Sequence, residues 1–284
     1  LKMQISGPEI LARTLSKPRV VDNRGNYWNY HSRSDHHSKV CCWAVVFDLL
    51  RVSSTLQKHV AEGHVGFGIN HEMRDFQNDR RKNLDLVICR PASGSKAGRD
   101  LVDLATHYRI DLSVSEQNEL TSLPRLQEVP VGSVLVALEA KACMTAHQKA
   151  LPRLYDELNS THLTVHGAHD SAIAAGIVVV NIAQRFLSPS RNIENPTVNP
   201  NWNVHPQPKS VEIVIEKVKQ LPRRSKTGIP GYDALGIVVI DCPNDGSDVR
   251  LYREPPAPQP QENYHYTTLI ERIRLLYDTR FAQI

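Results

Sequence analysis

A carboxylate and an ammonium group stand two positions apart at the end of an apolar run. Glu139 and Lys141 flank Ala140 at the end of the segment 134–141. Side chains at positions i and i+2 of a strand project from the same face, so the two charged groups lie together. Moving an ionised carboxylate out of water costs free energy unless it is paired or binds a metal. The pair therefore indicates a partner or a chemical task.

A second acid occupies a similar position. Asp85 lies near the start of the apolar segment 84–89. If the two strands are neighbours, Asp85, Glu139 and the backbone carbonyl of Ala140 offer oxygen ligands, which Mg²⁺ prefers together with water and phosphate oxygens. Lys141 would then neutralise or orient groups at the phosphate, while the metal lowers the pKa of the attacking water. The pattern predicts metal-dependent hydrolysis of phosphodiester bonds.

The elements that must position these residues follow from the hydrophobic periodicity. Apolar residues near the 3.6-residue period predict one long helix over 39–59, and short apolar runs predict strands. The central segments, in chain order, are a helix at 39–59, strands at 64–69, 84–89 and 134–141, a helix at 145–158 and a strand at 175–182. Pro152 predicts a kink or a new helix start within the second helix. The predicted fold class is α/β, with a central mixed β-sheet flanked by helices.

Further elements surround this core. Helices are predicted near 8–15, 100–108, 211–220 and 264–281, with a strand at 235–240. We predict an N-terminal arm over 1–38, polar after its short helix and lying on the surface. A core over 39–187 follows, and 188–284 form a C-terminal extension of the same domain.

These residues carry a resemblance to a known family. Asp85, then Glu139-Ala140-Lys141 at the end of an apolar strand, then a helix beginning at Thr145, resemble the PD-(D/E)XK nuclease superfamily, which includes type II restriction endonucleases. The family core is a helix, three strands, a helix and a fourth strand, and it matches the central segments over about half of the chain. The resemblance implies a restriction-endonuclease-like core that cleaves double-stranded DNA with Mg²⁺.

The resemblance also implies roles for individual residues. Asp85 and Glu139 correspond to the metal ligands and Lys141 to the catalytic lysine. Members often recruit a further acid from the first helix or strand, for which Glu62 and Glu72 are the candidates, and Glu72 is preferred.

The sequence departs from the family pattern in two ways. Leu84, not Pro, precedes Asp85, and Glu139 comes 54 positions after Asp85, so an insertion at 91–132 is implied. Asp111 is closer to Glu139 and competes for the place of the first acid, but its polar surroundings favour a loop and Asp85 is preferred. In the alternative interpretation, Glu139 and Lys141 simply form a solvated strand end.

Two basic clusters are candidates for DNA contacts. Lys and Arg side chains supply the salt-dependent part of DNA affinity. One cluster directly precedes the Asp85 strand and the other follows the helix at 211–220; they comprise Arg80, Arg81 and Lys82, and Arg223 and Arg224. Either cluster could equally be a solvated face.

The segment 191–207 is rich in Asn around Trp202. Asn side chains can bind the edge of adenine through two hydrogen bonds, so Asn201 and Asn203 could read a DNA sequence. Asn is also an ordinary loop residue, and an ordinary loop is the competing interpretation.

Composition limits the class of protein. Of the 284 residues, 40% are hydrophobic and 23% charged, and 34 Lys and Arg against 30 Asp and Glu give a net charge of +4. These values exclude a wholly disordered or collagen-like chain. No apolar run approaches the ~20 residues of a membrane-spanning helix. The five cysteines lack the ligand spacing of a zinc site and favour a reducing compartment, so we expect a cytoplasmic protein without membrane contact.

The expected function is that of a Mg²⁺-dependent DNA endonuclease, most simply a restriction enzyme. Because two-fold protein symmetry mirrors a palindromic DNA site, a homodimer is expected. The alternatives are a non-catalytic DNA-binding or assembly protein with a nuclease-like fold, and a nuclease of repair or recombination.

Overall fold

A six-stranded mixed sheet forms the centre of the protein. The computed structural model describes residues 5–94, 98–192 and 199–284. The strand order is β10-β9-β6-β5-β4-β3, with β5, β6 and β9 parallel and the remaining neighbours antiparallel. The sheet strands are β3 (Gly66–Asp75), β4 (Arg80–Pro91), β5 (Val131–Cys143), β6 (Ile173–Asn181), β9 (Ala234–Asp241) and β10 (Arg250–Leu251). The fold class is therefore α/β with a mixed central sheet, as predicted.

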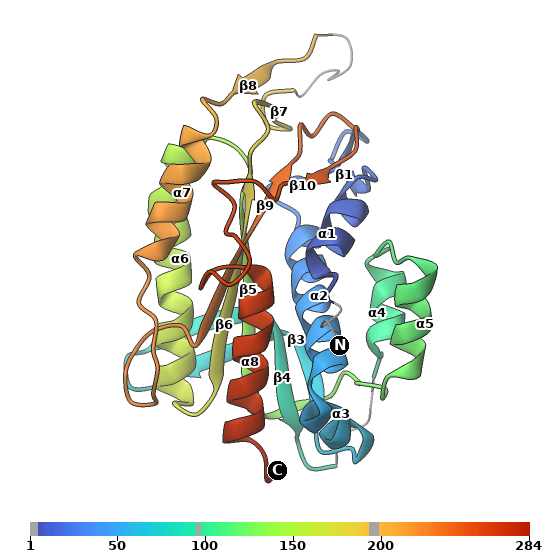
Figure 1. Cartoon of the computed structure of the whole chain (residues 1–284), viewed down its shortest axis with the longest axis vertical. Coiled ribbons are helices and arrows are strands. Elements are labelled where there is room, and N and C mark those ends of the chain that lie inside the picture. Colours follow the sequence, from blue (N-terminus) through green and yellow to red (C-terminus); the bar gives the residue numbers. More distant parts are fainter. Residues whose placement is uncertain (1–4, 95–97, 193–198) are drawn as a thin grey trace.

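Helices cover both faces of this sheet (Figure 1). Helices α1, α2 and α8 pack on one face with Leu86 and Ile88, and helices α6 and α7 pack on the other with Val87 and Cys89. The helices are α1 (Gly7–Leu15), α2 (His36–Val52), α3 (Ser54–Ala61), α4 (Leu101–His107), α5 (Val114–Ser122), α6 (His147–Ala168), α7 (Lys209–Lys219) and α8 (Tyr266–Arg280). Two-stranded ribbons are formed by β1 (Val20–Val21) with β2 (Tyr27–Trp28) and by β7 (Arg185–Leu187) with β8 (Trp202–Val204).

The single long helix predicted over 39–59 is instead two helices. Helices α2 and α3 meet at Ser53 with a bend of 97°. The backbone of Ser53 is extended, and its hydroxyl accepts the N–H of Leu56, so it caps α3. Ser residues favour such cap positions, which explains the break inside an apolar pattern.

Helix α6 shows the opposite deviation. It continues without interruption from His147 to Ala168 although Pro152 lies inside it. The new helix start predicted at Pro152 does not occur. Leu154, Leu158 and Val165 are buried after the proline, and the partly buried Ala150 and Leu151 pack before it, so packing stabilises the helix on both sides of Pro152.

Two segments outside the core are more ordered than the sequence suggested. Within the arm at 1–38, helix α1 packs against α2, and Trp28 and Asn29 are buried, which corrects the expectation of a surface arm. The segment 91–132 carries α5 in addition to the predicted α4. The α5 helix begins with a capping box formed by Ser113 and Glu116.

In the described ranges, no single helix has the length and hydropathy to cross a membrane. Among the described residues, α2 and α3 taken together reach that length and composition, but the chain bends by 97° between them.

Candidate active site

The site begins where two neighbouring strands separate. Pairing between β4 and β5 runs from Pro91 opposite Val131 to Leu86 opposite Leu138. Beyond that point β4 continues alongside β3, and β5 continues alongside β6. The backbone N–H of Ala140 lacks a strand partner on β4 and donates instead to the Asp85 carboxylate, at 3.0 Å. The Asp85 side chain thereby closes the point of separation, which we call the fork.

The strand itself changes course at Asp85. Strict alternation would place Leu84 on the same face as Leu86, yet Leu84 packs on the α6 side with Val87 while Leu86 packs on the α2 side. On β3, Asn70 adopts a left-handed backbone with φ 50°. The alternation therefore breaks at Asp85, which lets its carboxylate reach between the two strands.

Helix α2 supplies the other partners of Asp85. The Ser38 hydroxyl donates to the second carboxylate oxygen at 3.0 Å, and Lys39 Nζ lies 3.6 Å from that oxygen. Only 4% of the Lys39 side chain is exposed, and it also donates to the side chain of Asn70. The sequence prediction missed Ser38 and Lys39. A signal was present, because Lys39 precedes Trp43 and Val46 on the buried stripe of the helix.

Glu139 lies at the fork on the α6 side of the sheet. Its residue is 2% exposed, and one carboxylate oxygen contacts Lys141 Nζ at 2.7 Å and Lys82 Nζ at 3.5 Å. The other oxygen, Oε2, is buried and has no hydrogen-bond partner within the described part of the chain. Burial raises the pKa of Glu139, and the charge of Asp85 raises it further, against the opposing effect of Lys141 and Lys82.

Lys141 connects Glu139 to helix α6. Its Nζ lies 3.3 Å from Glu157, which in turn accepts from Arg153 at 2.6 Å. Burial lowers the pKa of Lys141, but Glu139 and Glu157 outweigh this effect, so its pKa is raised overall. Lys141 is therefore held as a cation, with a quarter of its side chain exposed.

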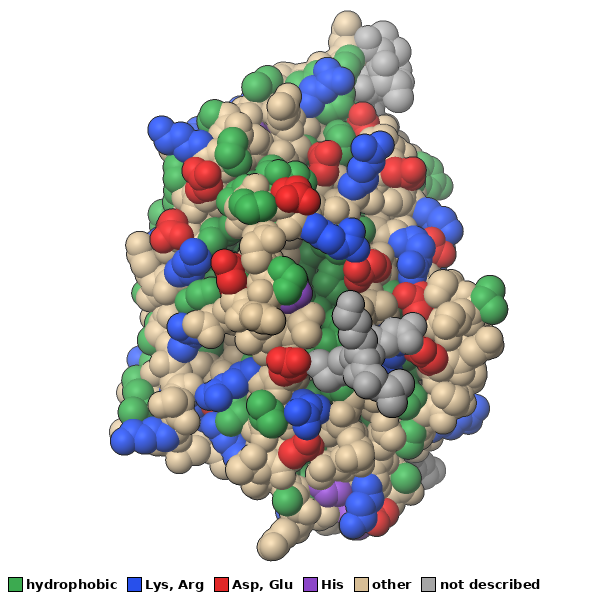
Figure 2. Space-filling model, viewed as in Figure 1, with side chains coloured by type: hydrophobic (Ala, Val, Ile, Leu, Met, Phe, Trp, Pro, Cys, Tyr) green, Lys and Arg blue, Asp and Glu red, His purple; other side chains and the backbone are tan. Residues whose placement is uncertain are grey.

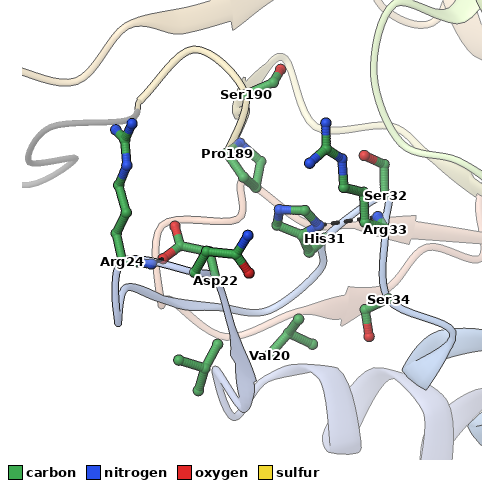
Figure 3. Close-up of a pocket in the computed structure, with 11 residues that line it drawn as sticks. Val20, Asp22, Arg24, His31, Ser32, Arg33, Ser34, Pro189 and Ser190 are labelled. Atoms are coloured by element: carbon green, nitrogen blue, oxygen red, sulfur yellow. Dashed lines mark hydrogen bonds between the residues drawn. The ribbon is translucent and has the colours of Figure 1, made fainter.

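A hollow of about 440 Å³ opens at this point. Asp85, Ala140 and Lys141 line it, together with Arg153 and Glu157 of α6, whereas Glu139 does not line it. A second hollow of about 420 Å³ adjoins the first, and the two share the segment 32–34. In the second hollow, Asp22, Arg24, His31 and Arg33 surround the space (Figure 3).

The donor set suits a hard divalent cation. Two carboxylates and a backbone carbonyl are oxygen ligands of the kind that Mg²⁺ takes, leaving positions for water and phosphate. The unpartnered Oε2 of Glu139 is the observation that fits a cation here, because a buried carboxylate oxygen without a partner is costly. Across the described ranges no three or more His, Cys, Asp or Glu side chains are grouped to hold a metal. A metal at the fork would thus depend on Asp85, Glu139 and the carbonyl of Ala140.

The other predicted acids lie elsewhere. Glu72 is exposed on the edge strand β3 opposite Asn83, and no contact joins it to Asp85 or Glu139 among the described residues. Glu62 caps the end of α3 beside His64. Asp111 pairs with Lys17 near α1 at 2.9 Å.

The predicted DNA-contacting residues divide into three groups. Arg81 and Arg223 are exposed and Arg80 is half-buried, whereas Lys82 points into the fork and contacts Glu139. Arg224 is fully buried against Asp233 and Asp170, so its predicted place on a DNA-binding surface is wrong. Arg224 contacts both acids, with Nη1 2.9 Å from Asp170 and Nε 3.0 Å from Asp233, and this structural task accounts for its burial.

The Asn-rich segment contributes differently from what its composition suggested. Asn201 is exposed, and its backbone, not its side chain, is bound by Asn192. Asn203 is half-buried and donates to Thr145 Oγ1 at 2.8 Å. Asn195, which belongs to the same segment, lies outside the described residues.

Comparisons with protein-family models, curated proteins and solved structures give no match to this chain. The class of protein must therefore be argued from the fold and the fork.

Proposed function

We propose that this chain is a Mg²⁺-dependent endonuclease that hydrolyses phosphodiester bonds of double-stranded DNA. The observation that carries the proposal is the meeting of Asp85, Glu139 and Lys141 at the fork, with one buried oxygen of Glu139 left without a partner. Residues 54 positions apart converge here beside a hollow of about 440 Å³. A solvated strand end would leave Glu139 exposed, and it is 2% exposed.

The order and pairing of the elements support the same reading. Helix α2, strands β3, β4 and β5, helix α6 and strand β6 follow one another as the PD-(D/E)XK resemblance implies. The first three strands pair antiparallel and β6 is parallel to β5. A fold alone does not establish an activity, so the proposed hydrolysis depends on the residues at the fork.

Each residue at the fork has a distinct role in this proposal. Asp85, Glu139 and the carbonyl of Ala140 would hold Mg²⁺, which lowers the pKa of bound water and stabilises charge on phosphate oxygens. Ser38 and Lys39 fix the orientation of Asp85 through its second oxygen. Lys141, held by Glu139 and Glu157, presents its ammonium group to a phosphate in the hollow and stabilises the negative charge that develops there.

We further propose sequence-specific cleavage of both strands by a homodimer, as in restriction enzymes, because two-fold symmetry of the protein would match a palindromic site. A cytoplasmic location agrees with this substrate. The five cysteines are free and buried, as expected in a reducing compartment.

A non-catalytic DNA-binding protein is the second candidate. The observation in its favour is that the fork already contains three lysines, Lys39, Lys82 and Lys141, which neutralise the acids without a metal. Thermal unfolding separates the candidates, because a ligand that binds only the folded state raises the melting temperature by mass action. Mg²⁺ or Ca²⁺ raises it if the fork binds metal and leaves it unchanged if the lysines suffice.

Cleavage of supercoiled plasmid and long linear DNA tests the proposal. We expect discrete fragments in Mg²⁺, no fragments in EDTA, and none with Glu139→Gln. Glu216→Gln is the matched control, since Glu216 is an exposed acid on α7 that pairs only with Lys219 in the described chain, and it should cleave as the wild type does. Equal cleavage by both variants would overturn the role of the fork. Shortening from DNA ends without internal fragments would favour a repair nuclease over a restriction enzyme.

A further inference from the structure

A separate hollow of about 490 Å³ lies between the start of α6, the start of α7 and strand β8. Lys149, Arg191 and Lys209 line it and are exposed. No Asp or Glu of the described residues lines this hollow, and within those residues none of the three cations forms an ion pair. We call it the α6 hollow.

The charge of the α6 hollow contrasts with that of the fork hollow. Among the residues that line the fork hollow, the three cations Arg33, Lys141 and Arg153 are balanced by three acids, Asp35, Asp85 and Glu157. A polyanion therefore gains little net attraction from the fork hollow itself. The adjacent α6 hollow, with three cations and no described acid, supplies the attraction that the fork hollow lacks.

Backbone groups add to the positive potential. Helix α6 is 22 residues long and begins without a side-chain cap or an acid in its first turn. Its first N–H groups therefore lack side-chain acceptors, and a helix start carries a partial positive charge that favours a phosphate. Helix α7 also begins at this hollow, with Lys209 as its first residue.

Two polar groups at the α6 hollow lack partners. His147 is 3% exposed, its Nε2 contacts the carbonyl of Asn181, and its Nδ1 has no partner in the described chain. The Oδ1 of Asn203 is likewise buried without a partner. Nε2 donates to that carbonyl, and burial lowers the pKa of His147 to about 4, so the free Nδ1 is an acceptor, as is Oδ1 of Asn203. A water or a hydroxyl group would satisfy these two acceptors, whereas the attraction for a phosphate comes from the three cations and the helix starts.

The α6 hollow is joined to the fork through one residue. Thr145 lines the fork hollow, and its hydroxyl contacts Asn203 at 2.8 Å and His205 at 3.0 Å, both of which line the α6 hollow. The two hollows therefore lie on either side of Thr145. Across the face seen in Figure 2, Lys and Arg are interspersed with Asp and Glu.

We propose that the α6 hollow binds a backbone phosphate of the DNA strand whose scissile phosphate lies at the fork. Lys149, Lys209 and the start of α6 are the main contacts, and Arg191 covers the outer side. The position of this phosphate relative to the scissile phosphate rests on the proposed endonuclease function. The binding of a phosphate in the α6 hollow does not depend on that function.

Salt dependence of DNA binding provides the test. Binding of a labelled duplex is measured in Ca²⁺ over a series of KCl concentrations, with the double variant Lys149→Gln/Lys209→Gln against the wild type. Each phosphate contact contributes about one unit to the slope of log K against log salt, so the double variant should lose about two units and bind more weakly at every salt concentration. An unchanged slope would overturn the proposal, as would a wild type that does not bind DNA.

Lys226→Gln is the matched control. Lys226 is exposed and lies two positions before Gly228, whose N–H donates to Asp170 just beyond the end of α6. The α6 hollow is at the other end of this helix, about 33 Å away along its axis. The slope of Lys226→Gln should equal that of the wild type. If the wild type binds DNA and the double variant loses slope, but no cleavage occurs in Mg²⁺, the endonuclease proposal fails and the phosphate site remains. If cleavage occurs and the slope is unchanged, the phosphate site fails and the endonuclease proposal remains.

Discussion

Two clusters of acids and cations lie on the central sheet, and their hydrogen bonding differs sharply. At the start of β6 and β9, Asp233 is buried and accepts from Arg224 at 3.0 Å, Arg280 at 2.6 Å, His166 at 3.1 Å and the N–H of Ala174 at 2.9 Å. At the fork, one oxygen of Glu139 contacts two lysines and the other has no hydrogen-bond partner in the described chain.

The difference separates structural from chemical use of the same residue types. A buried carboxylate whose two oxygens both accept hydrogen bonds, such as Asp233, stabilises one arrangement of the chain and offers no free acceptor to a ligand. A buried acid that lacks a partner and lies beside an open hollow retains capacity for a cation. The Asp233 cluster therefore holds the ends of α6, β6, β9 and α8 together, whereas the proposed function assigns the fork to substrate and metal.

Breaking the Asp233 cluster should have the largest effect on stability. Arg224→Ala leaves Asp233 buried with fewer cations, and removing one partner of a buried pair costs about 3–5 kcal/mol of unfolding free energy. Arg223→Ala, at the neighbouring and exposed position, should cost less than about 1 kcal/mol, mainly through its stacking on Tyr264. Urea unfolding at pH 7 measures both free energies. Equal losses in Arg224→Ala and Arg223→Ala would show that the Asp233 cluster does not stabilise the fold as proposed.

The acid at the fork should show the reverse pattern. Glu139→Gln keeps the side-chain volume and removes a charge with one unpartnered oxygen, so the unfolding free energy should change by no more than about 1 kcal/mol. DNA cleavage should fall by more than about 100-fold, because a metal ligand is lost. Urea unfolding and a cleavage time course, run on the same preparation, give both numbers. A large loss of unfolding free energy would show that Glu139 stabilises the fold, as Asp233 does.

Acid should weaken the Asp233 cluster selectively. Burial alone raises the pKa of Asp233, but hydrogen bonds from His166, Arg280 and Arg224 outweigh it and hold the pKa well below 3.8. Because the folded pKa is lower than the unfolded one, the stabilisation is complete above about pH 4 and is lost as pH falls below it.

Asp233→Asn tests this pH dependence. The difference in unfolding free energy between wild type and variant should be constant from pH 7 to pH 5 and then shrink by up to about 1.4 kcal/mol per pH unit below pH 4. Urea unfolding at pH 7, 5, 4 and 3 measures it. A difference that grows on acidification would contradict the sign.

The smallest effect is expected when a hydrogen bond that orients Asp85 is removed. Ser38→Ala removes the hydroxyl that donates to Asp85 at 3.0 Å and should cost about 1 kcal/mol of stability. Loss of a group that orients a ligand should raise the Mg²⁺ concentration for half-maximal cleavage by roughly 10-fold. Ser122→Ala, on the exposed end of α5, is the control. An unchanged Mg²⁺ requirement would mean that Ser38 does not position the acid.

The sequence predicted the sheet elements because hydrophobic periodicity depends on local spacing. The runs that became β4, β5, β6 and β9 were apolar enough to identify, and the two strands bearing Asp85 and Glu139 are indeed neighbours. The break at Ser53 was not predicted, because capping by one hydroxyl ends a helix without changing the apolar pattern.

Side-chain direction was much harder to predict than position along the chain. Lys82 and Arg224 belong to basic runs that resemble solvated clusters, yet both point inward because distant acids, Glu139 and Asp233, are there to receive them. Lys82 could have been found, since it shares a strand face with the buried Leu84. The burial of Arg224 depends on contacts between segments far apart in the chain, which a linear pattern does not encode.

The most direct test of the distinction between the two clusters is cleavage of one plasmid by three proteins in the same Mg²⁺ series. Wild type, Glu139→Gln and Asp233→Asn are compared at a temperature where each is folded by circular dichroism. We expect discrete fragments from the wild type and from Asp233→Asn, and none from Glu139→Gln. Cleavage by Glu139→Gln at the wild-type rate would contradict this expectation, as would loss of cleavage in folded Asp233→Asn alone.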